Sequence, residues 1–205
     1  GLTRTEIEGL SRDLSSIDTR TSQNELLGLA RVAGKLGITG RDNVYQFVSA
    51  ADKINIALGE DLGDNAEDAI REIGKLVDIF NISGEYGLEK AMLKTGSAIN
   101  TLGMSSTANE GYIVEFMKRI AGIATNADFS IDKMLGLAAT LDKYGQMSET
   151  SSTAIGQTIQ KMFSNTDEFA RAAGMSVKEF SNLLKTDVNE AFVRVLEGIN
   201  KNGAG

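Results

Sequence analysis

Apolar residues recur along most of the chain at spacings of three and four, which is the period of an amphipathic α-helix. Seven such stripes lie over residues 26–36, 44–58, 66–80, 88–102, 113–124, 131–141 and 155–163. Shorter pieces follow at 167–173 and 177–184, and a last helix is expected over 187–199. No run alternates between apolar and polar residues for long enough to indicate a strand. The pattern therefore predicts an all-α chain.

A glycine or an asparagine stands where most of these stripes end, and either residue can take the left-handed conformation that stops a helix. The predicted stops are Gly37, Gly59, Asn81, Gly103, Asn126 and Gly145, and they are separated by 22, 22, 22, 23 and 19 residues. Because each stripe ends instead of continuing as a heptad seam, the chain must fold back on itself. We expect a compact array or bundle of about eight to ten short helices with an approximately 22-residue helix-turn period. An internal repeat and ordinary helix lengths explain this period equally well.

Capping boxes mark several helix starts, because Ser, Thr or Asp followed by Glu three residues later satisfies free backbone N–H groups. The pairs are Thr3/Glu6, Ser22/Glu25, Asp64/Glu67, Thr107/Glu110, Ser176/Glu179 and Asp187/Glu190. The boxes at Asp64, Thr107 and Ser176 are the most persuasive, since each lies shortly after a predicted helix end.

Glycines give two further expectations. Gly103 should lie just past a helix end with φ > 0, so that Gly103→Val would destabilise the fold by about 1–2 kcal/mol. Glycines inside helices cost stability unless a neighbouring helix approaches closely over the missing side chain. We expect such close crossings near Gly136 and Gly122.

The chain has 205 residues, of which 41% are hydrophobic, so it can bury a substantial core. We interpret residues 1–205 as a single all-helical domain, with the main array over 1–163 and shorter C-terminal helices over 164–205. The start at Gly1 and the close on "NKNGAG" suggest that the domain was excised from a longer protein.

The composition argues against several kinds of catalysis and binding. Cys and His are absent, which removes thiolate and imidazole catalysis, and the net charge of −7 disfavours binding to phosphate backbones. The only basic run, Met117–Arg119, is expected on an exposed helix face, so no nucleic-acid site is predicted. No stretch approaches the ~18 apolar residues that span a bilayer, so no membrane segment is expected.

The richest acidic cluster consists of Glu60, Asp61, Asp64, Glu67 and Asp68. It lacks the register of a calcium loop, and helix capping by Asp64 explains it better, with Glu67 and Asp68 in the first turn. We therefore predict no catalytic residues, no cofactor-binding residues, no metal ligands and no enzymatic activity.

Four sequence segments, in a fixed order, show a family resemblance. They are "NELLGLARVAGKLGITGRDNVYQFVSAADKINIALGEDL", "AEDAIREIGKLVDIFNI", "LEKAMLKTGSAINTLGMSSTANEGYIVEFMKRIAGIA" and "LGLAATLDKYGQMSETSSTAIGQTIQKM". Over residues 22–163, and more loosely to 196, the chain resembles the helical domain of tailed-phage tape measure proteins. No catalytic motif accompanies the resemblance.

The resemblance implies a structural virion or prophage protein, involved in tail assembly, tail length determination and genome ejection. Its implied partners are tail tube and tail assembly proteins, with self-association as a further expectation. Its implied place is the virion tail, after assembly in the cytoplasm of the bacterial host. A compact domain of this length has a radius of gyration of roughly 17 Å and a width near 40 Å, which is wide for a tube lumen.

Two alternatives remain open from the residues alone. The first is a cytosolic helical-repeat adaptor or scaffold that binds a protein partner in its grooves. The second is an enzyme on a helical bundle, which would need clustered inward carboxylates. The flanks of the parent reading frame would discriminate the adaptor from the tail protein, and hydrolase assays would test the enzyme.

Overall fold

The computed structural model describes residues 4–59, 61–62 and 66–202, which form 12 α-helices without a strand in these ranges. The all-α prediction is confirmed, and the helix count exceeds the predicted eight to ten. The helices are α1 (Arg4–Ser15), α2 (Gln23–Lys35), α3 (Arg41–Leu58), α4 (Ala66–Ile79), α5 (Ile82–Tyr86), α6 (Leu88–Ser105), α7 (Glu110–Asn126), α8 (Ile131–Lys143), α9 (Ser148–Ser164), α10 (Thr166–Ala172), α11 (Val177–Thr186) and α12 (Val188–Asn202).

The two helices without a predicted stripe are α1 and α5. Helix α1 buries little more than Leu10 and Leu14, and most of its other residues are polar. Helix α5 has five residues and none of them is buried. Helix α5 is little more than one turn long, so it cannot show a hydrophobic period. Helix α1 is longer and carries Ile7, Leu10 and Leu14 at spacings of three and four, a short stripe that the sequence analysis missed.

The helices form two layers. Helices α2, α4, α7 and α9 contact one another in sequence, and α1, α3, α6 and α8 do so in the other layer. Contacts such as α2 with α3, α4 with α6 and α7 with α8 join the layers. The first-layer helices begin at residues 23, 66, 110 and 148, which gives steps of 43, 44 and 38 residues. The structural unit is thus about twice the predicted helix-turn period, because one unit contains a helix from each layer.

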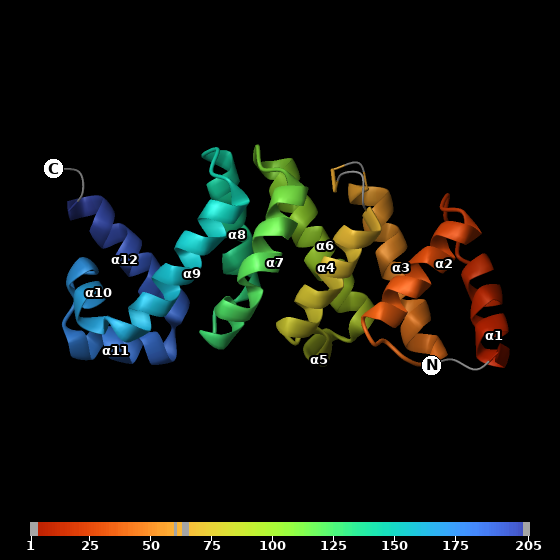
Figure 1. Ribbon diagram of the computed structural model, residues 1–205, viewed down its shortest axis with the longest axis horizontal. Helices are drawn as coiled ribbons and strands as arrows, with labels where there is room; N and C mark the ends of the chain where they lie inside the picture. The colour runs from red at the N-terminus through yellow and green to blue at the C-terminus, as the bar shows by residue number, and fades with distance from the viewer. Residues whose placement is uncertain (1–3, 60, 63–65, 203–205) are drawn as a thin grey trace.

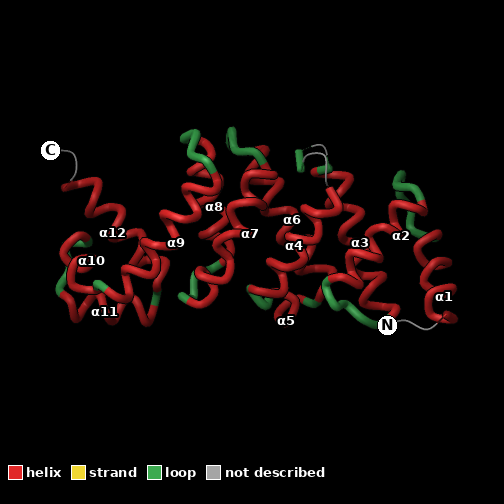
Figure 2. Tube along the Cα trace, viewed as in Figure 1, coloured by secondary structure: helices red, strands yellow, loops and turns green. Residues whose placement is uncertain are grey.

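These units stand side by side in a row, with α1 at one end and α10–α12 at the other (Figure 1). Every substantial helix–helix contact joins helices no more than three places apart in the chain. Figure 2 shows that the loops lie along the two edges of the row. The accessible surface is 11273 Å², against roughly 9300 Å² for a compact monomer of this mass. The array is elongated, so the width expected for a round domain does not describe it.

The core follows the seam between the layers. Its largest completely buried side chains include Phe47 from α3, Met92 from α6 and Phe116 from α7. At the far end, Phe129 and Phe192 meet edge to face, with ring centroids 5.7 Å apart. This aromatic contact ties the start of α12 to the connection between α7 and α8.

Three of the predicted helix stops are confirmed. Gly37, Asn81 and Gly145 all have positive φ, at 76°, 51° and 69°. Gly59 also follows a helix end, but it has φ −54° and is not left-handed. Near Asn126 the left-handed residue is Asp128, with φ 63°.

The prediction for Gly103 is wrong. Helix α6 continues through Gly103 to Ser105, and the Ser106 hydroxyl donates a hydrogen bond to the Leu102 carbonyl at this end. Gly103 instead gives space to the buried side chain of Glu110, which a Cβ atom there would overlap. The left-handed argument for Gly103→Val therefore does not apply.

The capping boxes at Ser22 and Ser176 are confirmed, with both reciprocal hydrogen bonds present. Asp187 also caps its helix, since the Glu190 backbone N–H donates to its Oδ1 at 3.0 Å. The prediction for Thr107 is wrong, because Asn109 caps α7 through Tyr112 N–H. The predicted boxes at Thr3 and Asp64 lie outside the described residues.

The expected crossings near Gly136 and Gly122 are wrong, because a Cβ atom at either position would meet nothing within 4 Å. The close approaches occur elsewhere. At Gly96 of α6, a Cβ atom would lie 2.6 Å from Ile54 Cγ1 of α3, and at Gly198 of α12 it would overlap the Ala172 carbonyl oxygen of α10. At Gly198 the backbone of α12 therefore packs directly against the backbone at the end of α10.

We predict that Gly198→Ala lowers the free energy of unfolding by about 1–3 kcal/mol, because the added methyl group meets backbone that cannot rotate away. The matched control is Gly122→Ala, which should raise the free energy of unfolding by about 0.5–1 kcal/mol, because alanine has the higher helix propensity and its methyl group meets open space. Urea denaturation of both variants measures the difference. Equal effects of the two substitutions would contradict the close crossing of α10 and α12.

We also predict a pH-dependent contribution from the cap of α11. Hydrogen bonds from the Ser176 hydroxyl and backbone N–H hold the pKa of Glu179 below its usual range. The stabilisation is therefore complete above the unfolded value of about 4.3 and is lost as the pH falls through the lower folded pKa. Glu179→Gln should be less stable than the parent at neutral pH and equally stable in strong acid, as measured by denaturation across pH.

In a Ser176→Ala background the same Glu179→Gln change should have a smaller effect at neutral pH, because the hydroxyl hydrogen bond is lost and only the bond from the backbone N–H of residue 176 remains. A difference that persists in strong acid would show that the carboxylate acts through some other contact.

Candidate functional site

The acidic cluster does not converge on one point. Asp68 Oδ1 lies 2.6 Å from the Arg71 guanidinium, whereas the Glu67 carboxylate lies against Gly28 of α2. Glu60 and Asp64 are outside the described residues. Over the residues that the structure describes, no group of three or more His, Cys, Asp or Glu side chains could hold a metal ion.

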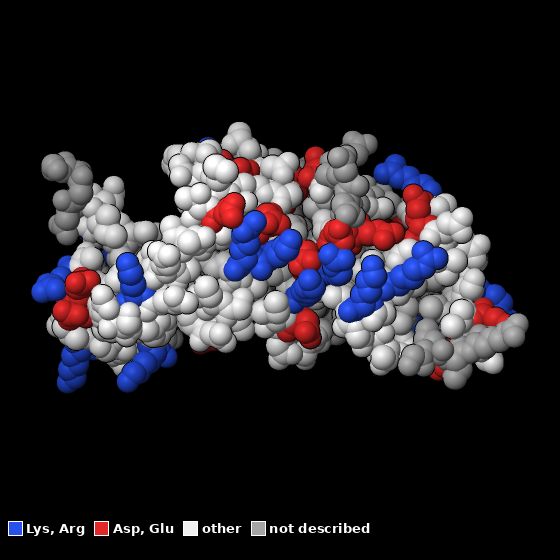
Figure 3. Space-filling view, in the orientation of Figure 1, with Lys and Arg blue, Asp and Glu red and all other residues white. Residues whose placement is uncertain are grey.

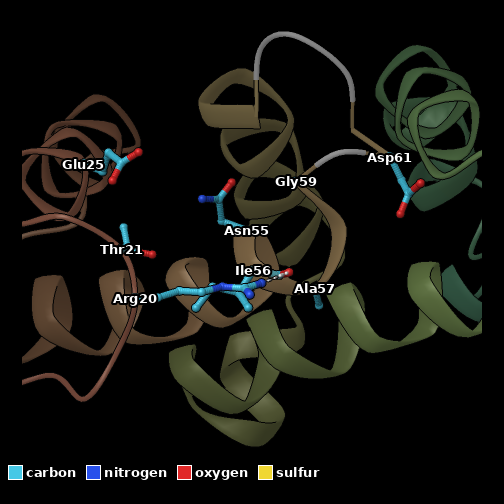
Figure 4. A pocket seen from close by; sticks show the side chains of 8 residues that line it. All are labelled: Arg20, Thr21, Glu25, Asn55, Ile56, Ala57, Gly59 and Asp61. Atoms are coloured by element: carbon cyan, nitrogen blue, oxygen red, sulfur yellow. Dashed lines mark hydrogen bonds between the residues drawn. The ribbon is translucent and has the colours of Figure 1, made fainter.

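Asp61 lines a polar pocket of about 480 Å³ between the α1–α2 connection and the end of α3 (Figure 4). Arg20 lies across this pocket and donates from Nη2 to the Ile56 carbonyl at 3.4 Å. Glu25 stands at its rim, where hydrogen bonds from Ser22 keep the pKa of Glu25 below its usual range. Its Oε2 is occupied by the Ser22 hydroxyl and backbone N–H, and Thr21 contributes the pocket's hydroxyl. These groups can form hydrogen bonds with a ligand, but they do not form a nucleophile–base pair.

A larger groove, of about 710 Å³, lies between α5, α6 and the start of α8. Much of its wall is apolar and consists of Phe80, Ile82, Leu93, Ala98, Phe129 and Leu135. Its polar lining includes Glu85, Lys90, Lys94 and Asp132. Apolar walls with a few charged groups are typical of sites that hold another molecule by burial and orient it by charge.

Tyr86 organises the basic side of this groove. The Lys94 ammonium lies 4.4 Å from the centre of the Tyr86 ring, and the Lys90 ammonium lies 5.5 Å from it. A hydrogen bond to Glu85 raises the pKa of Tyr86, which keeps the phenol neutral. The sequence analysis missed this cluster. In the sequence, the cluster is indicated by the four-residue spacing of Tyr86, Lys90 and Lys94. This spacing is easily overlooked because the break at Gly87 places Tyr86 in α5 and the two lysines in α6.

Charged side chains gather in a row on one face. Figure 3 shows Lys and Arg side chains over α2, α4 and α7, with Asp and Glu side chains beside them. The basic residues of these helices are Arg31, Lys35, Arg71, Lys75, Lys118 and Arg119. Glu72 pairs with Arg71 and Lys75, and Glu115 pairs with Lys118 and Arg119, at 2.9–3.5 Å. Carboxylates thus compensate the basic side chains of α4 and α7, which leaves less uncompensated positive charge for a phosphate backbone.

In the described part of the chain, no helix combines the length and the apolar character that crossing a membrane requires.

The chain was compared with protein families, curated proteins and solved structures. A family model described as phage-related minor tail protein matches residues 8–204. Neither a curated protein nor a solved structure matches the chain. Because the family match covers nearly all of the sequence, the protein belongs to the phage-related minor tail protein family.

Proposed function

We propose that this protein is a tape-measure-type component of the phage tail that takes part in tail assembly, sets tail length and leaves ahead of the genome during ejection. Membership of the minor tail family supports a structural role in the tail. The ordered phrases over residues 22–163 support the tape measure assignment. Tail tube and tail assembly proteins would be its partners, and the virion tail its place after assembly in the host cytoplasm. A prophage origin is compatible with this role.

The observation that carries the proposal is the local contact pattern. Since most helix–helix contacts join helices close together in the chain, with α12 against the α7–α8 connection as an exception, helix pairs can be added or removed within the row without rebuilding a central core. Length is then proportional to the number of units, which is the property that a molecular ruler needs. The same pattern allows the array to open one pair at a time when it must pass through a narrow tube.

The proposed role requires no catalytic centre. We propose that the protein acts as a structural component that binds other tail proteins during assembly. Its polar pocket lacks a nucleophile–base pair, and the acidic residues Glu67 and Asp68 point to different neighbours. Function would then depend on correct folding and on the surfaces that contact other tail proteins.

The groove beside Tyr86 favours one other candidate, a helical-repeat adaptor that binds a protein segment. Its apolar wall and two lysines would suit an amphipathic segment with acidic residues. An adaptor would tolerate a change in the number of helix pairs away from the groove without any change in tail length, whereas a ruler would not.

We predict that in-frame removal of residues 66–109, one unit of the array, shortens the tail by at most about 66 Å, the rise of an extended helix of that length. Removal of the whole segment should stop tail assembly or shorten the tail by no more than roughly 310 Å. Electron microscopy of particles from a phage that carries the altered gene measures the change. Tails of unchanged length after either deletion would contradict the ruler.

The matched controls are single substitutions in the acidic cluster. Asp61→Ala and Asp68→Ala should each leave infectious particles with tails of normal length. If either change abolished infectivity while the purified protein stayed folded, the assembly proposal would be wrong and the cluster would need a chemical role.

A further inference from the structure

The last three helices pack mainly on one another. Helices α10, α11 and α12 are all in mutual contact, and α12 packs against the end of α10 at Gly198. Each of the three helices contributes at least one completely buried apolar side chain, as Ala170, Phe180 and Val195 show. We call α10–α12 the C-terminal unit. It lies at one end of the row of helices (Figure 1).

Few contacts join the C-terminal unit to the row formed by α1–α9. Within the described ranges, the substantial helix–helix contact between them is that of α9 with α10, and these two helices are consecutive in the chain. Inside the row, pairs such as α3 with α6 and α7 with α9 are in much more extensive contact. Parts of a chain that share only a small interface are expected to move relative to each other.

The covalent junction is suited to such a movement. Helix α9 ends at Ser164 and α10 begins at Thr166, so Asn165 is the one residue between them. Asn165 has φ −122° and ψ 46°, which is not a helical conformation. Hinges are usually a few residues at the ends of elements that absorb a change in φ and ψ. A rotation at Asn165 would move the C-terminal unit and leave both flanking helices intact.

Two contacts hold the other side of the unit, and we call them the latch. The Phe192 ring meets the Phe129 ring edge to face at 5.7 Å. Asn189 Oδ1 accepts a hydrogen bond from the Ser130 backbone N–H at 3.2 Å. Asn189 and Phe192 lie three residues apart in α12 and therefore on the same side of the helix. The latch thus joins the start of α12 to the connection between α7 and α8, which is 59 residues away in the sequence.

We propose that the C-terminal unit is hinged at Asn165 and that the latch holds it closed against the row. Phe129 and Phe192 are only 5% and 6% exposed in the closed form. Opening would bring both rings into water, so the closed form dominates and the open form is a minor state. Phe129 and Ser130 also line the groove beside Tyr86, so opening would free one wall of that groove.

The first test measures distances between pairs of spin labels by pulsed electron paramagnetic resonance. The 205-residue chain contains no Cys, so labels attach only at cysteines that are introduced. Exposed Lys143 of α8 and exposed Lys178 of α11 report on the unit relative to the row. We expect a main closed distance and a minor second distance for this pair. Control pairs at Lys35 and Lys143 within the row, and at Lys178 and Asn200 within the unit, should each give one distance.

The second test weakens the latch without disturbing the unit. Phe192→Leu removes the aromatic contact, and Asn189→Ala removes the acceptor for the Ser130 N–H. Each change should raise the ratio of open to closed form by about threefold to tenfold, as expected for the loss of one such contact. The matched control is Asn182→Ala on the exposed side of α11, which should leave the ratio unchanged.

Two outcomes would overturn the proposal. The first is a single, identical distance between Lys143 and Lys178 in the parent and in both latch variants, which would show a rigid junction. The second is a new distance within the unit whenever one appears between the unit and the row, which would show local unfolding instead of rotation. Neither outcome depends on whether the protein sets tail length.

Discussion

The structure depends on burial along a seam between two helix layers. Isolated helices of these lengths are at best marginally stable in water, and most of them gain stability by placing an apolar stripe against the adjacent helices. Phe47, Met92 and Phe116 contribute to one continuous seam, although they come from helices far apart in the sequence. Because the seam runs along the row and does not surround a centre, contacts stay local and the surface exceeds that of a round protein. The open, elongated form is a consequence of where the stripes face.

Close approach between helices is the second requirement, and it is met by glycine. Gly96 receives the Ile54 side chain, and Gly198 allows α12 to cross the end of α10. At these positions glycine loses helix propensity but gains packing that a methyl group would prevent. By contrast, Gly122 and Gly136 face open space. Glycine lowers helix propensity at these two positions without allowing closer packing of a neighbouring helix. The same residue type therefore has opposite effects at positions that look alike along the chain.

The surfaces divide according to what they could bind. In the charged row over α2, α4 and α7, carboxylates pair with the basic side chains of α4 and α7, which suits a solvated face. The groove beside Tyr86 combines an apolar wall with two lysines.

The sequence by itself determined the all-helical class, most helix positions, the left-handed ends at Gly37, Asn81 and Gly145, and the caps at Ser22 and Ser176. These features depend on residues within one or two turns, so a local pattern contains the information. Only the tertiary structure decided the rest. Whether Gly103 ends a helix or admits Glu110 depends on a residue in the next helix, and the grouping of helices into pairs depends on which stripes meet. The groove beside Tyr86 joins α5 and α6 to α8, which begins 45 residues after Tyr86. Such outcomes are fixed by packing between segments, where the free energy of burial outweighs local preference.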